Sequence, residues 1–215
     1  MADLQTTAGA LSAALRPSSH INRKPAAHLL NAINLARRLG RPLNQFVTIN
    51  FDHTACPAKL VSRQFKRLRD NYFSPWLRRN GVGPIAPPTF VWSVENDGAC
   101  AVHWLVHIPK GRVGDFRKRL HDWLASVAGE IRCSQAIHVR YAPAPPGAGK
   151  YMLKGINPAW AQPYGIRHIS QGIVHGKRSG FSRCLGPTTR RRLQDAGLVP
   201  RLRRLTHGTA TVPPV

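Results

Sequence analysis

The sequence predicts an α+β fold, a ferredoxin-like or split βαβ antiparallel sheet with helices on one face. Between residues 46 and 141 the apolar patterns follow the order strand, helix, strand, strand, helix, strand, which is typical of this plan. The two middle strands are joined by Asp97-Gly98, a strong signal for a tight hairpin. A chain of 215 residues that is 42% hydrophobic is long enough to bury the core of one such domain.

The first expected elements are a helix, a strand and a second helix. Residues 25–39 repeat apolar side chains at helical spacing and stop at Gly40. Residues 46–50, FVTIN, are β-branched and alternate, as in a strand. Residues 58–79 return to helical spacing, and we expect Pro75 to interrupt that helix because proline lacks the backbone N–H.

The second half of the predicted core begins with the hairpin and ends with a short helix. Its strands alternate apolar and polar side chains, and its long helix stops at a glycine. In order, the expected elements are strands at 89–96 and 99–109, a helix at 112–129, a strand at 134–141, a loop at 142–149 and a short helix at 150–156.

The composition divides the chain into three parts. Residues 1–44 form an N-terminal helical segment, and residues 45–165 hold the sheet. From residue 166 to 215 the chain is rich in Gly, Arg, Pro and Thr, with little apolar periodicity. We therefore expect a basic, flexible tail that orders only on its partner.

The charge balance predicts the class of partner. The chain has 32 Lys and Arg against 9 Asp and Glu, a formal net charge of +23, which attracts polyanions. No run approaches the roughly 18 apolar residues of a membrane span, and no basic segment opens a signal peptide. Four cysteines without C-x-x-C spacing are typical of reduced thiols in the cytoplasm. The expected partner is therefore a nucleic acid, not a membrane, and the expected location is the cytoplasm.

Basic side chains cluster in two places that are candidates for binding the nucleic-acid backbone. One is the polar face of the helix at 58–79, and the other is the tail. The candidate residues are Arg63, Lys66, Arg67, Lys177, Arg178, Arg190, Arg191 and Arg192.

The second strand of the hairpin, AVHWLVHIP, carries two histidines on one face, His103 and His107. In a regular strand four residues separate their side chains by roughly 13 Å, which is too far for one small ion. Glu95, on the neighbouring strand, can meet His103 across the hairpin. We expect His103 and Glu95, with His107 as a further candidate, to hold Mg²⁺ or Mn²⁺; the alternative is a half-buried sheet with a surface glutamate.

Tyr151 and Lys154 are three residues apart, so they share one face of the expected short helix. A nearby ammonium group favours the phenolate and stabilises developing phosphate charge, which a tyrosine nucleophile requires. Y-x-x-K also occurs by chance.

Together these segments resemble the HUH endonucleases, and most of all the rolling-circle replication initiators, or Rep proteins, of plasmids and phages. FVTINF at 46–51 is similar to the family's first motif, and Tyr151 with Lys154 is similar to its nucleophile motif. Ala101-Val102-His103 stands where the family has His-hydrophobic-His, so Ala101 replaces one metal ligand, and Glu95 matches the acidic third ligand. The resemblance covers residues 46–156.

The resemblance implies a single-stranded DNA endonuclease and strand transferase. Tyr151 would attack the scissile phosphate at the origin of a plasmid, phage or mobile element, forming a 5′-phosphotyrosine and a free 3′-OH. The chain has no P-loop ATPase motif, so strand separation would depend on a host helicase or on supercoiling. Two alternatives remain: a non-catalytic DNA-binding protein of the same fold, favoured by Ala101, and a basic RNA-binding protein.

Overall fold

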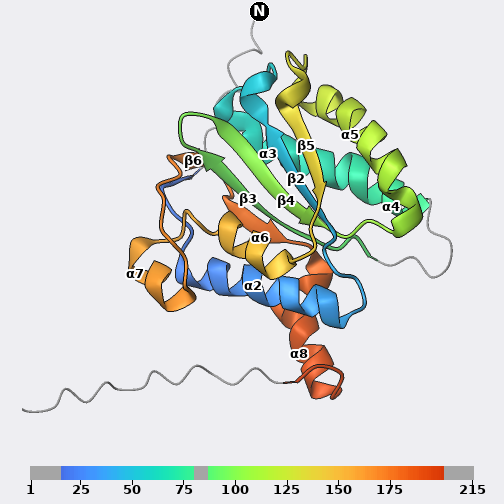
Figure 1. The fold of residues 1–215 in the computed structure, drawn as a ribbon, viewed down its shortest axis with the longest axis vertical. Coiled ribbons are helices and arrows are strands. Elements are labelled where there is room, and N and C mark those ends of the chain that lie inside the picture. The colour runs from blue at the N-terminus through green and yellow to red at the C-terminus, as the bar shows by residue number, and fades with distance from the viewer. Residues whose placement is uncertain (1–15, 80–86, 201–215) are drawn as a thin grey trace, which may run out of the picture.

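A computed structural model describes residues 16–79 and 87–200, and the α+β prediction is confirmed (Figure 1). The centre is a five-stranded antiparallel sheet with the strand order β5-β2-β4-β3-β7. The strands of this sheet are β2 (Gln45–Asn50), β3 (Phe90–Asn96), β4 (Cys100–Val106), β5 (Ile137–Tyr141) and β7 (Ser179–Phe181). The two strands of the predicted hairpin, β3 and β4, pair directly, and Gly98 between them has a φ of +70°.

The register of the sheet decides which side chains share a face. Thr48 lies opposite His103, and Phe46 lies opposite Leu105, so β2 and β4 present these four residues to one side. The alternate positions, such as Val47 and Trp104, face the other side. This alternation separates a polar site from a large aromatic core.

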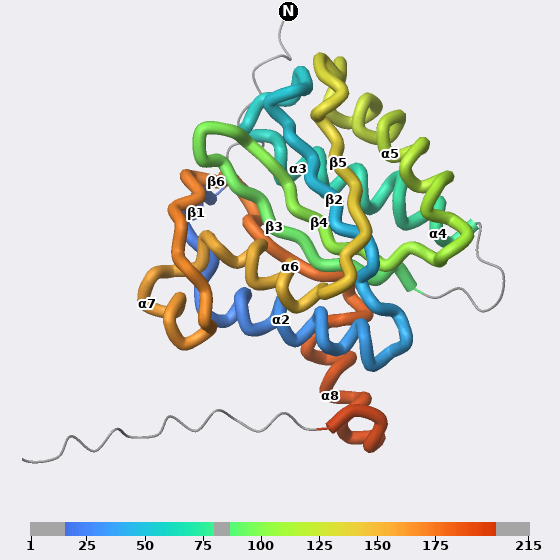
Figure 2. Tube along the Cα trace, viewed as in Figure 1, coloured from blue at the N-terminus to red at the C-terminus, as the bar shows by residue number. Residues whose placement is uncertain are grey.

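The helices of the predicted βαββαβ order lie on the aromatic face (Figures 1 and 2). They are α3 (Val61–Arg67), α4 (Ser74–Arg79) and α5 (Val113–Ala128). Phe73 lies at their centre, with its ring 4.8 Å from that of Trp104. This face is the main hydrophobic core of the domain.

The opposite face carries two further helices, so the sheet is covered on both sides. They are α2 (Arg23–Arg38) and α6 (Pro145–Met152), and they pack on Phe46, Val91 and Leu105. The α+β class is as predicted, but the expected placement of the helices on one face is wrong, because α3–α5 cover one face and α2 and α6 cover the other. Gly149 lets the two helices approach closely, since a Cβ there would collide with the end of the Ile33 side chain.

The predicted interruption near Pro75 is a π-helical segment rather than a break. Residues Leu68–Phe73 follow the wider π pattern, and Pro75 lies in the first turn of α4 directly after it. Proline cannot donate to the carbonyl four residues earlier, and a π segment accommodates that loss within one continuous helix.

The predicted start of the short helix near residue 150 is wrong. Helix α6 begins at Pro145, and Pro145 and Pro146 occupy its first turn, where the missing N–H groups cost nothing. The helix ends at Met152, so Lys154 lies in the turn that follows and donates its backbone N–H to the Tyr151 carbonyl.

The prediction of a tail without its own structure is also wrong for residues 166–200. Strand β7 extends the sheet beside β3, where Gly180 passes against the ring of Trp92. The other elements outside the central sheet are β1 (Pro17–Ser18), α7 (Pro158–Ala161), β6 (Val174–His175) and α8 (Pro187–Asp195). The predicted tail residues after 200 lie outside the described part. None of the helices within 16–79 and 87–200 has the length and apolar character to cross a membrane.

Candidate active site on the α6 face of the sheet

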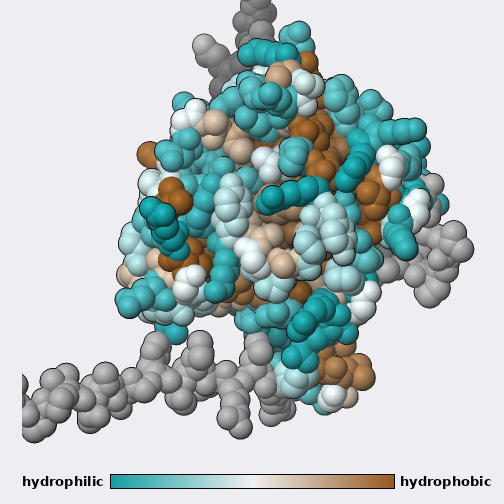
Figure 3. Space-filling view, viewed as in Figure 1, coloured by the Kyte–Doolittle hydropathy of each residue, from teal (hydrophilic) through white to brown (hydrophobic). Residues whose placement is uncertain are grey.

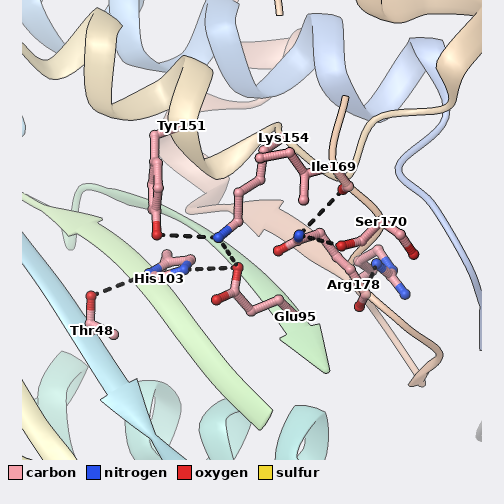
Figure 4. A network of polar contacts seen from close by, with 9 residues as sticks. Thr48, Glu95, His103, Tyr151, Lys154, Ile169, Ser170 and Arg178 are labelled. Atoms are coloured by element: carbon pink, nitrogen blue, oxygen red, sulfur yellow. Dashed lines mark hydrogen bonds and ion pairs between the residues drawn. The ribbon is translucent and has the colours of Figure 1, made fainter. Parts of the chain in front are cut away.

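Four of the predicted site residues meet on the face of the sheet that α6 covers (Figure 4). Glu95 comes from β3 and His103 from β4, whereas Tyr151 and Lys154 come from the end of α6 and the turn after it. The side chains of Tyr151 and Lys154 point toward the strands, so residues about fifty positions apart in the sequence form one group.

His103 is held in place on three sides. Its side chain is 4% exposed, its Nδ1 is 3.2 Å from Thr48 Oγ1, and its ring stacks on Phe46 with centroids 5.6 Å apart. The contacts allow either tautomer. A proton on Nε2 would be donated to Glu95, whereas a proton on Nδ1, donated to Thr48, would leave the Nε2 lone pair for a metal ion.

Glu95 Oε2 is the centre of the group. It lies 3.0 Å from His103 Nε2 and 2.9 Å from Lys154 Nζ. Burial alone would raise the pKa of Glu95, but the neighbouring His103 and Lys154 outweigh it and lower that pKa below its ordinary value. Burial likewise opposes the charged form of Lys154, yet Glu95 and then Tyr151 raise its pKa. At neutral pH both groups are therefore charged.

Tyr151 combines a fixed hydroxyl with access to solvent. Lys154 Nζ donates a hydrogen bond of 3.2 Å to the Tyr151 hydroxyl, and the tyrosine ring lies edge-on to His103 with centroids 5.1 Å apart. The residue is nevertheless 46% exposed. A phenol oxygen that accepts from an ammonium group, on a residue this exposed, is a candidate nucleophile toward a phosphate that binds beside it.

The residues present fit a divalent ion with two protein ligands. Within the described ranges, no group of three or more His, Cys, Asp and Glu side chains is arranged around a metal position. The buried His103 Nε2 has no aligned hydrogen-bond partner, however, and its distance of 3.0 Å from Glu95 Oε2 equals that of adjacent ligands around an octahedral ion with bonds of about 2.1 Å. Mg²⁺ commonly takes its other ligands from water and substrate phosphates.

The other predicted ligand positions do not join this pair. His107 follows the end of β4, where its Nδ1 is 2.8 Å from the Pro42 carbonyl oxygen. It lies four residues beyond His103, a spacing that is too long in a strand for one small ion. Ala101 lies opposite Glu95 in the register of β3 and β4 and is 7% exposed. Its side chain shares the face of His103 but supplies no ligand atom.

The basic residues predicted from the sequence are not gathered at this site. Arg63, Lys66 and Arg67 lie on α3, across the sheet from Tyr151, and Lys66 pairs with Asp70 at 2.6 Å. Arg178 is 5% exposed and donates to backbone carbonyls and to Ser18, so it is buried in the fold and not on an open surface. Its burial arises because residues 166–200 fold onto the domain.

The remaining four predicted basic residues differ in exposure. The ammonium group of Lys177 lies over the ring of Trp92 on the aromatic side. Arg191 and Arg192 are exposed on α8, and Arg190 is half-buried there. Hydrophilic side chains spread over much of the surface visible in Figure 3.

Sequence reasoning identified the β2 strand but missed the roles of its side chains. Phe46 and Thr48 fix the ring of His103, and the Arg140 guanidinium of β5 lies over Phe46 with its carbon 4.9 Å from the ring centre. The alternation of FVTINF is the available signal, since Phe46 and Thr48 are two residues apart and share a face. Only the pairing of β2 with β4 brings that face to His103.

Comparison with known proteins yields no relative. No family model matches the chain, and neither a curated protein nor a solved structure does.

Proposed function

We propose that the chain is a Rep-like endonuclease that nicks and rejoins single-stranded DNA through Tyr151, at the origin of a plasmid, phage or other mobile element. The observation that supports this most is the continuous polar contact from the Tyr151 hydroxyl through Lys154 to Glu95 and His103. It joins the hydroxyl of a partly exposed tyrosine to a cation and to two side chains that fit a metal ion.

The reaction that this arrangement supports is a transesterification. The Tyr151 oxygen bonds to the phosphorus as the bond from phosphorus to the 3′ oxygen breaks, which leaves a 5′-phosphotyrosine and a 3′-OH. The phenol gives up its proton to solvent, and the departing 3′ oxygen takes one from it. Lys154, charged at neutral pH, stabilises the negative charge that develops on the phosphate.

Glu95 and His103 are the residues that would hold Mg²⁺ or Mn²⁺, which supplies Lewis-acid polarisation of the phosphate when bound. Thr48 and Phe46 orient the His103 ring for this role. Arg140, near the same ring of Phe46, is a cation that a bound strand would meet beside the site.

The excess of basic residues supports a polyanionic partner, because phosphate contacts dominate the affinity of proteins for DNA. A host helicase would be needed where the origin is not already single-stranded. The reaction belongs in the cytoplasm, where such elements replicate.

The test is covalent capture of the DNA. The chain is incubated with Mn²⁺ and single-stranded oligonucleotides that tile the genetic element encoding it, each labelled in one set at the 3′ end and in another at the 5′ end. A 5′-phosphotyrosine retains the 3′-labelled fragment on the protein in a denaturing gel, whereas 5′-labelled DNA yields a shorter free fragment. Tyr151→Phe should abolish the adduct, and Tyr141→Phe, which alters a tyrosine that is 65% exposed on β5, should retain it.

The alternative function is a DNA-binding protein without nuclease activity, and Ala101 is the observation that favours it. A methyl group replaces a ligand directly opposite Glu95 in the sheet. Oligonucleotide binding with no adduct in the wild-type chain, on any tile, would support this alternative and contradict the nuclease.

A further inference from the structure

A second candidate site lies beside the first, in a pocket of about 430 Å³ between the start of α2 and β7. Its volume falls within the range of about 300–1,000 Å³ that small-molecule sites occupy. One part of its wall is apolar or aromatic, from Ile21, Pro25 and Phe181. None of the residues that line the pocket belongs to the group formed by Tyr151, Lys154, Glu95 and His103.

The pocket is electropositive. Its lining includes Arg16, Lys177, Arg178, His20 and His28 and, within the described residues, no Asp or Glu. Burial, followed by the positive charges of Arg190 and Lys24, lowers the pKa of His28. Within the described residues, no carboxylate in the pocket wall balances the charges of Arg16, Lys177 and Arg178.

Arg178 is the buried cation of this site. It is 5% exposed, and it donates to the Ser18 hydroxyl and to backbone carbonyl oxygens, with no carboxylate of the described residues among its partners. A buried guanidinium group without a counter-charge is costly, and an anion bound in the pocket would reduce that cost. The N-terminus of α2 adds to the attraction, because Asn22 makes no side-chain capping bond and the first turn has no acidic residue.

Backbone hydrogen bonds place the pocket next to the candidate active site. The Val94 N–H, beside Glu95, donates to the carbonyl of Arg178. The N–H of Ile21 donates to the carbonyl of Gly155, which follows Lys154. Two walls of the pocket are therefore attached to the strand and the turn that carry Glu95 and Lys154, and Figure 4 shows Arg178 beside that group.

We infer that this pocket binds one nucleotide of the single strand that crosses the active site. The phosphate would lie toward Arg178, His28 and the first turn of α2, and the base would pack on the rings of Phe181 and His28, whose centroids are 6.0 Å apart. The inference rests on the proposed function only in taking the nucleotide to be part of the single-stranded DNA substrate. The chemistry that it requires is that of a nucleotide.

The experiment uses the full chain with Tyr151→Phe, so that no covalent adduct forms. Binding of dTMP and of inorganic phosphate is measured by calorimetry, and binding of a labelled short oligothymidylate by fluorescence anisotropy. His28→Glu places a carboxylate in the pocket, and its control His121→Glu makes the same change on the exposed surface of α5. Arg16→Glu with control Arg117→Glu repeats the comparison with exposed residues, in case His28→Glu does not fold.

We expect dTMP to bind more tightly than phosphate and to compete with the oligothymidylate. In each pocket variant, but not in the controls, its affinity should fall about tenfold, which corresponds to the loss of one charge-assisted contact. Equal affinity for dTMP and phosphate would overturn the nucleotide assignment. Simultaneous binding of dTMP and the oligonucleotide would assign the pocket to a free nucleotide instead and overturn its place on the strand. Adduct formation by the chain that retains Tyr151, with no dTMP binding, would leave the nuclease intact and refute the pocket alone.

Discussion

We expect the ion pair between Glu95 and Lys154 to have a larger coupling energy than an exposed ion pair, because both side chains are largely buried. At 2.9 Å and an effective dielectric constant of about 20, the Coulomb attraction is about 6 kcal/mol. The side chains are only 19% and 17% exposed, so desolvation offsets most of this attraction and leaves about 1–3 kcal/mol. Lys66 and Asp70 are closer, at 2.6 Å, but their side chains are 69% and 43% exposed, and such helix pairs contribute about 0.3–0.5 kcal/mol.

Two double-mutant cycles measure this difference. Urea unfolding of Glu95→Gln, Lys154→Met and their combination gives one coupling energy, and Asp70→Asn, Lys66→Met and their combination gives the other. We expect the first to exceed the second at least twofold. Equal coupling energies would refute the reasoning that burial, rather than distance, makes the Glu95 contact strong.

Three other changes have definite expected outcomes. The pKa of Glu95 is lowered from its ordinary value of 4.5, so its contribution to stability is present above that pH and is lost as the pH falls through the folded-state pKa. The difference in unfolding free energy between wild type and Glu95→Gln should therefore shrink in acid. An unchanged difference would contradict the direction of the pKa shift. Phe73→Ala removes a ring that meets five others and should cost about 3–5 kcal/mol by urea unfolding, whereas Leu198→Ala, 71% exposed, should change stability by less than about 0.5 kcal/mol; similar costs would refute the position of the core. Ala101→His should tighten Mn²⁺ binding in an electron paramagnetic resonance titration, because it adds an imidazole opposite Glu95, and the exposed control Ala99→His should not; equal affinities would exclude a metal position between Glu95 and His103.

The sequence predicted the core of the fold because strand and helix periods alternate clearly between residues 46 and 141. It failed for β7, since a three-residue strand centred on Gly180 has almost no pattern, and its position is decided by the fit of that glycine against Trp92. The start of α6 was missed for a related reason. Pro145, Pro146 and two glycines are typical of a loop, and the helix is favoured only by its packing against α2.

The contacts of the candidate site could be predicted where residue spacing along the chain determines them, but not where the pairing of distant strands determines them. Tyr151 and Lys154 are three residues apart, so their contact follows from one turn of chain. Glu95 could be placed near His103 because the Asp97-Gly98 hairpin fixes their register. The supports from Phe46, Thr48 and Arg140 depend on the order of β5, β2 and β4, which no local pattern specifies.

The most direct test of the central claim is to identify the residue that carries DNA. The chain holds four tyrosines, at positions 72, 141, 151 and 164, and trypsin should release Tyr151 in the short peptide Tyr151–Lys154. After reaction with single-stranded DNA and Mn²⁺, followed by nuclease trimming and trypsin, mass spectrometry should find this peptide with a 5′-linked nucleotide on Tyr151. A nucleotide on Tyr72, Tyr141 or Tyr164, or on none of the four while DNA binding is retained, would contradict the account.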